Sequence, residues 1–278
     1  ERSLHQRPVP RMGGIGVAIG MAASVLFVSQ LEWWPLWLGA LVLVSISFLD
    51  DLIGLPIIGR LLVQFVVAGG VVAGLLLTHT GVGWALLAIV AIVWMTNLYN
   101  FMDGMDGLAG GMALFGFGFY ALAGMLSGHL PFALTSASIA AAAGAFLLFN
   151  FHPARIFMGD AGSTLLGFLA ACLGLVGWHL GIWTLWFPGL VFSPFIVDAT
   201  LTLARRLLWG EKVWLPHREH EYQKLVVAGW GHRRTAVVEY VLMVVCGTVA
   251  LVYEHTADRF RLMVVVFLAI GFFVLTKA

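Results

Sequence analysis

The sequence has 278 residues, of which 61% are hydrophobic and only 10% are charged, and its mean hydropathy is +0.97. This composition excludes a water-soluble globular domain of this length. The formal net charge is +1, and no basic stripe is interleaved with aromatic residues outside the loops, which excludes a nucleic-acid partner. The chain is therefore expected to be solvated mainly by membrane lipid.

Continuous apolar stretches recur along nearly the whole chain, each close to the roughly 20 helical residues that cross a bilayer. They do not alternate between polar and apolar residues as barrel strands do. The predicted fold is therefore all-α, a polytopic transmembrane helical bundle that forms one domain over residues 1–278. About ten spans are predicted, at residues 13–31, 35–49, 60–78, 83–99, 107–127, 131–149, 164–181, 183–204, 235–253 and 262–277.

The basic residues lie almost entirely on one side of these predicted spans. If the first span runs outward, 13 of the 15 Lys and Arg residues lie in or beside the inner loops or at the end of the chain, and only Arg259 and Arg261 lie outside. Positive charge accumulates on the cytoplasmic side of membrane proteins. We therefore expect the inner loops to face the cytoplasm.

A pair of acids, Asp50 and Asp51, ends the second predicted span. A carboxylate left in hydrocarbon costs about 2.5 to 3.5 kcal/mol on insertion scales, so membrane proteins keep acids for interfaces, cavities and functional sites. Neighbouring residues on a helix point about 100° apart, so these two carboxylates are expected to face different partners. The alternative is that they only cap a helix at the interface.

The next inner segment carries polar residues every third position, at Asn97, Asn100, Asp103 and Asp106. This spacing predicts that they line one side of a helical or near-helical turn. Their amides and carboxylates supply both donors and acceptors, as nucleotide recognition requires. An Asn/Asp/Gly turn without a ligand is the alternative.

The fourth inner loop opens the following span with small residues and places Asp160 among them. A helix start of this kind leaves backbone N–H groups for phosphate, and a carboxylate beside it can hold a cation opposite the phosphate. A simple helix cap is the alternative.

The last inner loop is the longest and gathers His217, Arg218 and His220 beside the membrane. The His spacing could suit zinc, but acids outnumber Cys and His ligands in the inner loops. A guanidinium with two imidazoles suits pyrophosphate better. A solvated basic loop that only fixes topology is the alternative.

Taken together and in this order, these segments resemble the polyprenyl-phosphate N-acetylhexosamine-1-phosphate transferases, the glycosyl transferase family 4 of integral membrane enzymes. The resemblance runs from Arg7 to about Thr235. It rests on the Arg-Pro-Val-Pro-Arg-Met-Gly-Gly stretch from Arg7, the Asp50–Asp51 pair, residues 97–108, residues 157–163, Asp198 with Arg205 and Arg206, and the His217 loop.

The resemblance implies an Mg²⁺ enzyme, with Mn²⁺ as a substitute. Such an enzyme transfers a sugar 1-phosphate from a UDP-N-acetylhexosamine-type donor to undecaprenyl phosphate and releases UMP. It also implies a further membrane helix before Glu1, and a multi-pass protein of the bacterial cytoplasmic (inner) membrane whose active face is cytoplasmic. Membrane lipid is the expected surrounding partner, and the oligomeric state stays open, with a homodimer as one option.

The resemblance assigns nucleotide recognition to Asn97, Asn100 and Asp103. Asp106 is expected to support the phosphates or the loop itself, as a further substrate-binding residue.

The remaining roles follow from the needs of phosphoryl transfer, which are charge neutralisation and alignment. Asp160 is the expected anchor of the magnesium ion, with Asp51 as the second ligand. Asp50, counted with Asp51 as catalytic, is expected to meet the attacking lipid phosphate. The donor pyrophosphate is expected at the last inner loop, held by His217, Arg218 and His220, and the two histidines are also counted as catalytic.

The form of the Arg7 motif is more similar to the branch that initiates O-antigen (lipopolysaccharide), enterobacterial common antigen or teichoic acid chains than to the peptidoglycan branch. The His-Arg-x-His loop departs from the His-x-His-His form of N-acetylglucosamine enzymes. That departure leaves the donor open between N-acetylglucosamine and fucosamine- or quinovosamine-type sugars, and favours the latter.

Two other functions compete with this interpretation. An ion-coupled transporter would place its acids mid-membrane on broken helices, whereas these acids lie at the inner ends of spans. A CDP-alcohol phosphotransferase would continue the Asp103–Gly107 run with Ala-Arg and a distal acid pair, which are not found here.

Overall fold

The computed structural model describes residues 10–28, 33–75, 81–212 and 218–256, and within them every regular element is a helix. The predicted span at 262–277 and two sequence-predicted residues, Arg7 and His217, lie outside the described residues. The first helices are α1 (Gly13–Val28), α2 (Trp34–Ile53), α3 (Ile57–Leu75), α4 (Val82–Met102), α5 (Leu108–Leu126) and α6 (Leu130–Asn150). They are followed by α7 (Gly159–His179), α8 (Trp186–Val191), α9 (Ser193–Leu208), α10 (Glu221–Leu225), the π-helical turn η2 (Val226–Trp230) and α11 (Gly231–His255).

Among the described residues, seven helical segments are long and apolar enough to cross a membrane. They are α2 to α7 and the stretch Glu221–His255, which contains α10 and α11. The all-helical membrane bundle is therefore confirmed, whereas the count of about ten spans is not.

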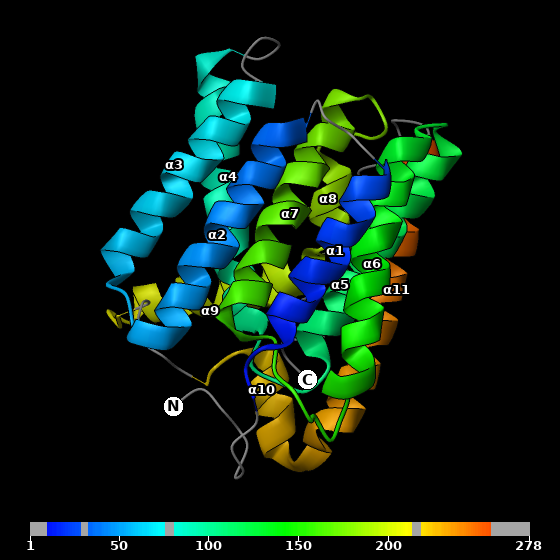
Figure 1. Ribbon diagram of the computed structural model, residues 1–278. Helices are drawn as coiled ribbons and strands as arrows, with labels where there is room; N and C mark the ends of the chain where they lie inside the picture. The colour runs from blue at the N-terminus through cyan, green and yellow to red at the C-terminus, as the bar shows by residue number, and fades with distance from the viewer. Residues whose placement is uncertain (1–9, 29–32, 76–80, 213–217, 257–278) are drawn as a thin grey trace.

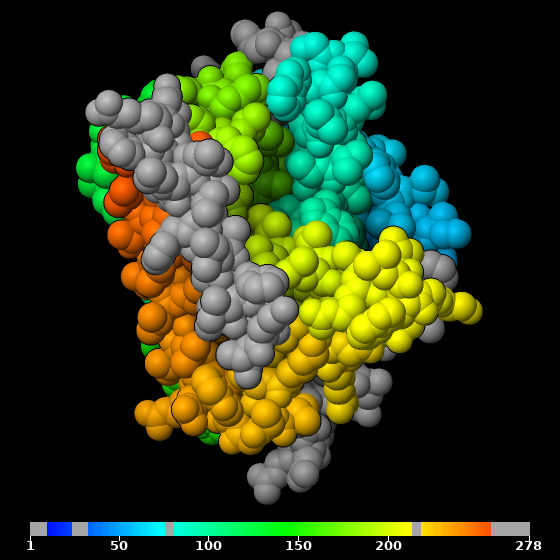
Figure 2. Space-filling model, turned by 180° about the vertical axis from the view of Figure 1, so that it is seen from behind, coloured from blue at the N-terminus to red at the C-terminus, as the bar shows by residue number. Residues whose placement is uncertain are grey.

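The prediction of one span over 183–204 is wrong. The segment is divided at Phe192, which separates the short helix α8 from α9. Pro194 stands in the first turn of α9, where its missing N–H costs nothing, but a continuous helix through this point would lose a backbone hydrogen bond. Helix α9 carries Arg205 and Arg206 in its last turn and extends outward from the bundle (Figure 2).

Helix α7 forms the centre of the bundle and packs against α1, α2, α4 and α5 (Figure 1). Its sequence is rich in Gly and Ala, and most of its residues are buried. Small residues let helix backbones approach closely in a membrane, where no hydrophobic effect drives helices together. The first turn of α7, with Asp160, is therefore held among the ends of its neighbours.

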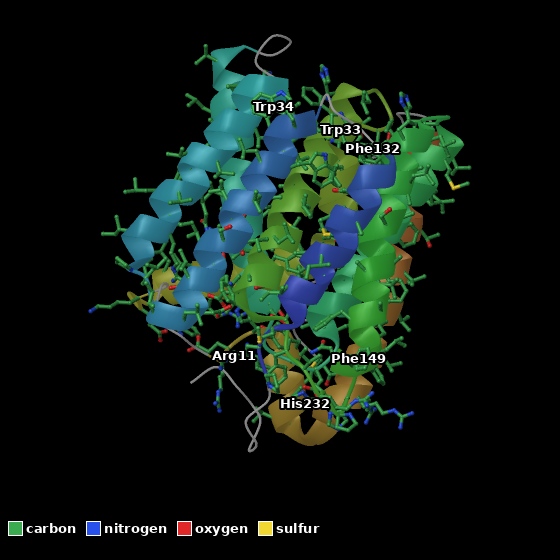
Figure 3. The ribbon with its side chains drawn as sticks, viewed as in Figure 1. Arg11, Trp33, Trp34, Phe132, Phe149 and His232 are labelled. Carbon is green, nitrogen blue, oxygen red and sulfur yellow. The ribbon has the colours of Figure 1, made fainter. Side chains whose placement is uncertain are left out.

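The two ends of the bundle differ in chemistry (Figure 3). Trp33, Trp34 and Phe132 lie at one end, where the rings of Trp33 and Phe132 meet edge to face at 5.9 Å. Arg11 and His232 lie at the opposite end. This second end, which we call the loop end, also carries α10 and the connection between α6 and α7 (Figure 1). The predicted gathering of the inner loops at one end is confirmed.

Candidate active site

Backbone hydrogen bonds join the segment before α1 to the start of α7 at the loop end. The Phe157 backbone N–H donates to the Pro10 carbonyl at 2.7 Å, and the Gly13 N–H donates back to the Phe157 carbonyl at 2.9 Å. Gly14 follows with a 2.8 Å bond to the Met158 carbonyl. A Cβ on Gly14 would lie 2.3 Å from the Gly162 nitrogen, so only glycine allows this approach. The glycine pair therefore places Arg11 beside the start of α7.

Two carboxylates, Asp50 of α2 and Asp160 of α7, meet the guanidinium of Arg60 from α3, and the Asp51 carboxylate lies close to both. We call this group the acidic centre: Asp50, Asp51, Asp160 and Arg60. The Arg60 guanidinium forms an ion pair with Asp50 and lies 3.4 Å from the Asp160 carboxylate. Asp50 also accepts a 2.7 Å hydrogen bond from the Leu55 N–H, which closes the turn after α2. Arg60 thus joins Asp50, ten positions before it, to Asp160, 100 positions after it.

Asp51 points to a different set of partners. Its carboxylate accepts a hydrogen bond from the Ala161 backbone in the first turn of α7. A Cβ built on Gly159 would lie 3.2 Å from Asp51 Oδ2, so the carboxylate lies against the start of α7. The expectation that Asp50 and Asp51 face different partners is confirmed. An anion at a helix N-terminus is also favoured by the helix dipole.

Asp103 stands just after the last residue of α4 and faces the acidic centre. Burial and the nearby Asp160 and Asp51, opposed by Arg11, together raise the pKa of its carboxyl to about 7. A second cation close to these acids would return Asp103 to its ionised form.

Asn97 and Asn100 line a small polar cavity of about 50 Å³ together with Arg60, Gln64 and Asp160. The Asn97 amide nitrogen donates to Gln64 Oε1 at 2.6 Å and to the Val93 carbonyl at 2.8 Å. Both amide hydrogens are therefore used within the protein, and Asn97 can offer a ligand only its carbonyl oxygen. The structure thus brings Asn97, Asn100 and Asp160 together as the sequence predicts.

Arg60 is a site residue that the sequence reasoning missed, because it was counted only as one of the basic residues near an inner loop. The available signal was its position, ten residues after Asp50 at the start of the next apolar helix. A short hairpin between two spans brings such residues together.

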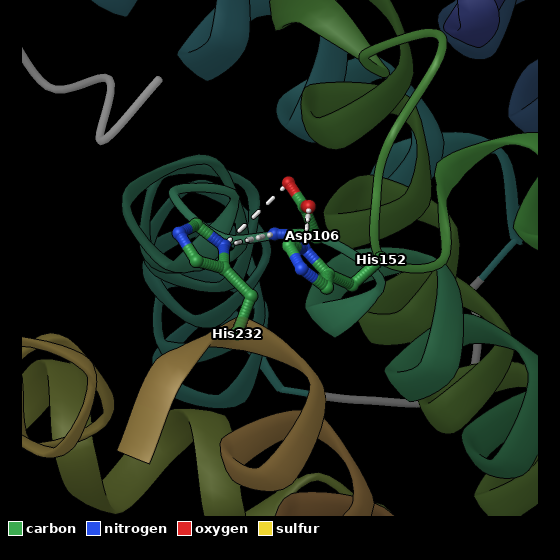
Figure 4. Close-up of side chains that lie close together, drawn as sticks. All are labelled: Asp106, His152 and His232. Atoms are coloured by element: carbon green, nitrogen blue, oxygen red, sulfur yellow. Dashed lines mark hydrogen bonds and ion pairs between the residues drawn. The ribbon is translucent and has the colours of Figure 1, made fainter. Parts of the chain in front are cut away.

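Asp106 does not continue the line of Asn97, Asn100 and Asp103, because α4 ends at Met102 and the chain turns. The Asp106 side chain is fully buried, and its Oδ2 binds His152 Nδ1 at 2.7 Å and the Ala154 N–H at 3.1 Å. His232 lies on its other side (Figure 4). The single polar line predicted for all four residues is therefore corrected, and a contact between Asp106 and substrate stays a prediction.

His220 is buried behind the last loop, with 2% of its side chain exposed. Its Nδ1 lies 3.0 Å from Asp198 Oδ1, and Asp198 also accepts the backbone N–H groups of Glu221 and Tyr222. Asp198 thereby orders the start of α10. A catalytic role for His220 stays a prediction.

Arg218, the other described residue of the predicted pyrophosphate group, is exposed at the loop end. Its role also stays a prediction.

Helix α10 packs directly on the turn that carries Asp103. A Cβ on Gly104 would lie 2.3 Å from the Tyr222 hydroxyl and 3.2 Å from Gln223 Nε2, so the turn and α10 touch closely. The loop end therefore unites the segments before α1 and after α2, α4, α6 and α9.

The donor atoms of the acidic centre suit a hard cation. Asp51 and Asp160 offer oxygen only, and the four carboxylates, with Asp50 and Asp103, outnumber the guanidinium groups of Arg60 and Arg11. Magnesium binds one or two carboxylates together with phosphate oxygens and water, so these residues fit the ion that the sequence predicts.

Comparisons with known proteins agree with this arrangement. The family model described as glycosyl transferase family 4 matches residues 33–177, a range that holds the acidic centre and the turn after α4. The match ends before α9 and the last loop.

Several bacterial enzymes are similar over most of the chain. A probable undecaprenyl-phosphate N-acetylglucosaminyl 1-phosphate transferase of Bacillus subtilis is 30% identical over 97% of this chain and 80% of its own length. A decaprenyl-phosphate N-acetylglucosaminephosphotransferase of Mycobacterium tuberculosis is 29% identical over 95% of this chain and 77% of its own length. A phospho-N-acetylmuramoyl-pentapeptide-transferase of Halalkalibacterium halodurans is 29% identical over 90% of this chain and 85% of its own length.

Proposed function

Because the chain belongs to glycosyl transferase family 4, we propose that it transfers an N-acetylhexosamine 1-phosphate from a UDP-sugar to undecaprenyl phosphate. The products are undecaprenyl-diphospho-sugar and UMP. The observation that carries the proposal is the pairing of Arg60 with Asp50 and Asp160 beside the polar cavity of Asn97 and Asn100.

The acidic centre supports a magnesium-dependent reaction. Asp160 and Asp51 would hold the ion, which supplies charge neutralisation at the phosphate oxygens when bound. Asp50 contacts the same guanidinium nitrogen of Arg60 as Asp160 does, and it would orient the attacking lipid phosphate. The guanidinium of Arg60 suits a phosphate, because it offers several donors in one plane.

The cavity beside the acidic centre supports donor binding. Asn97 would offer its carbonyl oxygen to the uracil or ribose, and Asn100 its amide. Asp103 would add a hydrogen-bond acceptor in the turn after α4. Arg218 would approach the pyrophosphate of the UDP-sugar from the exposed side of the last loop.

The polyprenyl chain of the acceptor needs an apolar surface that opens to the membrane. A groove of about 220 Å³ between α4, α7, α8 and α9 offers one, with Trp94, Pro188 and Ile196 among its lining residues. Figure 2 shows the surface hollowed between α4 and α8, above α9. The apolar lining makes this groove the expected position of the chain.

The cellular setting forms part of the same proposal. The charge asymmetry of the sequence supports a cytoplasmic active face in a bacterial inner membrane. Among donors, UDP-N-acetylglucosamine is the first choice because the similar enzymes of Bacillus and Mycobacterium carry that sugar in their names. Fucosamine- and quinovosamine-type donors, a role in initiating O-antigen or a related surface polymer, and a homodimeric assembly are the further points to test.

Transfer assays with purified protein, undecaprenyl phosphate and a panel of radiolabelled UDP-sugars test the proposal. We expect a lipid-extractable product that forms together with UMP and requires Mg²⁺. Uptake of solute into proteoliposomes without any lipid product would favour the transporter alternative. Product from a CDP-alcohol donor but from no UDP-sugar would favour the CDP-alcohol enzyme.

A further inference from the structure

A group of metal-binding side chains lies outside the acidic centre, and we call it the histidine cluster: Asp106, His152 and His232 (Figure 4). Each residue comes from a different segment of the loop end. Asp106 lies in the turn before α5, His152 lies in the connection between α6 and α7, and His232 lies at the start of α11. None of the roles proposed above for nucleotide, magnesium or lipid phosphate uses the two histidines.

The distances within the histidine cluster are close to those of a metal site. His152 Nδ1 lies 2.7 Å from Asp106 Oδ2, and His232 Nδ1 lies 3.5 Å from Asp106 Oδ1. One ligating atom from each residue lies within 4.8 Å of the other two. Two ligands of a tetrahedral zinc ion lie about 3.3 Å apart, since each bond is about 2.0 to 2.1 Å long. Small rotations of the imidazole rings would therefore bring all three atoms into one coordination shell.

The hydrogen bonds already place the right atoms toward a common point. The Asp106 backbone N–H donates to His232 Nδ1 at 3.3 Å, so this nitrogen carries a lone pair, which a bound cation would take over from the amide after a rotation of the ring toward the carboxylate. The other imidazole, His152, lies beside the carboxylate and stacks on His232 with the rings 16° from parallel. A cation bound here would replace the proton between His152 Nδ1 and the carboxylate, and that proton would leave to solvent.

The donor set differs in kind from that of the acidic centre. Two imidazole nitrogens and one carboxylate favour zinc and related transition metals, whereas magnesium prefers oxygen ligands alone. The Asp106 side chain is fully buried, and 40% of the His152 side chain is exposed. The exposed side leaves room for water as a fourth ligand and for the entry of the ion.

We propose that Asp106, His152 and His232 bind one zinc-class divalent cation, separate from the magnesium ion of the reaction. The ion fastens three segments of the loop end to one another. Asp106 lies two residues after Gly104, in the turn that also contains Asp103. The connection that contains His152 leads into α7, which carries Asp160. Metal binding at the cluster therefore stabilises the loops that carry the acidic centre.

Metal analysis of the purified full chain tests this proposal without relying on turnover. After removal of any histidine tag and dialysis against a chelator, we expect elemental analysis to show one equivalent of Zn²⁺ retained after reloading. Titration with Co²⁺ should produce the visible absorption of a site containing nitrogen ligands. A large excess of Mg²⁺ should leave this absorption unchanged.

Two conservative variants locate the ion. His152→Gln and His232→Gln should each weaken Co²⁺ binding at least tenfold. The matched control is His255→Gln, an exposed histidine at the end of α11, and it should bind Co²⁺ as the unmodified protein does. Zn²⁺ should raise the thermal unfolding temperature of the unmodified protein and of the control, but not that of the two cluster variants.

Three results would overturn the proposal. The first is metal retention well below one equivalent after reloading. The second is Co²⁺ absorption that persists in both cluster variants. If either cluster variant fails to fold, the other variant and the metal content of the unmodified protein still decide the question. The third is displacement of Co²⁺ by Mg²⁺, which would assign the bound ion to oxygen ligands.

Discussion

Asp103 and Asp106 are three residues apart in the chain but lie in two different environments. Asp103 faces the acidic centre, where Asp51, Asp160 and Arg11 act on its carboxyl. Asp106 turns into the histidine cluster, where His152 and the Ala154 N–H bind the carboxylate. Both residues follow the end of α4 at Met102, so no helix sets their relative direction. Equal spacing predicts a shared face only as long as the helix continues.

The two regions also differ in how their charge is balanced. In the acidic centre Asp50 and Asp160 share the Arg60 guanidinium and Asp51 lies beside them, so a hard cation and phosphate oxygens would complete it. In the histidine cluster one carboxylate meets two imidazoles, which favours a softer ion. The loop end thus contains two centres of different chemistry, one for the reaction and one for holding the loops.

The largest effect is expected at the acidic centre. Asp160→Asn preserves size but removes the charge that anchors magnesium, so transfer should fall by about a thousandfold or more. The protein should remain folded and membrane-inserted. The matched control is Glu254→Gln, which also replaces a carboxylate by an amide. Glu254 lies at the opposite end of the bundle, where it accepts a hydrogen bond from the Thr184 hydroxyl. Near-normal turnover of Asp160→Asn, with the same magnesium requirement, would remove Asp160 from the metal site.

A smaller effect is expected when the bridging guanidinium is replaced. Arg60→Gln leaves Asp50 and Asp160 without their shared cation, so kcat should fall by about 10- to 100-fold, the scale of one lost charge-assisted interaction. Arg60→Lys should recover part of the loss. Steady-state kinetics on both variants measure this. Equal activity of Arg60→Gln and the unmodified enzyme would make the bridge irrelevant to the reaction.

Nucleotide binding should respond to Asn100 of the polar cavity. Asn100→Ala should weaken UMP binding by about 1 to 3 kcal/mol, because a buried polar partner of the nucleotide is lost. Calorimetric titration with UMP measures the change. The control is Ser138→Ala, whose exposed hydroxyl bonds only to its own helix. Unchanged UMP affinity of Asn100→Ala would place the nucleotide elsewhere.

The smallest effect concerns the pH dependence of stability. The pKa of Asp103 is about 7 in the folded protein, above its value of about 3.8 when unfolded, so protonation favours the folded state. This contribution is present at low pH and is lost as the pH rises through 7. Between pH 6 and 8 it amounts to about 1 kcal/mol, because only the last part of the titration falls in this range.

Thermal unfolding in the presence of a chelator measures this contribution. The unmodified protein should lose more stability between pH 6 and 8 than Asp103→Asn does. An equal loss in the two proteins would show that the carboxyl is ionised throughout this range.

The sequence predicts the helical class and the meeting of Asp50, Asp51 and Asp160, because apolar length and charge asymmetry place the ends of their spans on one side. Local signals also suffice for the helix start at Asp160. The pairing of Asp106 with His152 and His232 could not be predicted, since it joins residues 46 and 126 positions apart through packing alone. The break between α8 and α9 was signalled by Pro194, which the hydropathy of the segment obscured.

Binding of Mn²⁺ to the purified protein, followed by electron paramagnetic resonance, tests most directly whether the reaction's cation lies in the acidic centre. Mn²⁺ stands in for Mg²⁺, and two variants separate the two centres. The account predicts that Asp160→Asn loses Mn²⁺ binding, whereas His152→Gln retains it with unchanged affinity. Retention of Mn²⁺ by Asp160→Asn together with its loss in His152→Gln would place the cation in the histidine cluster and contradict the account.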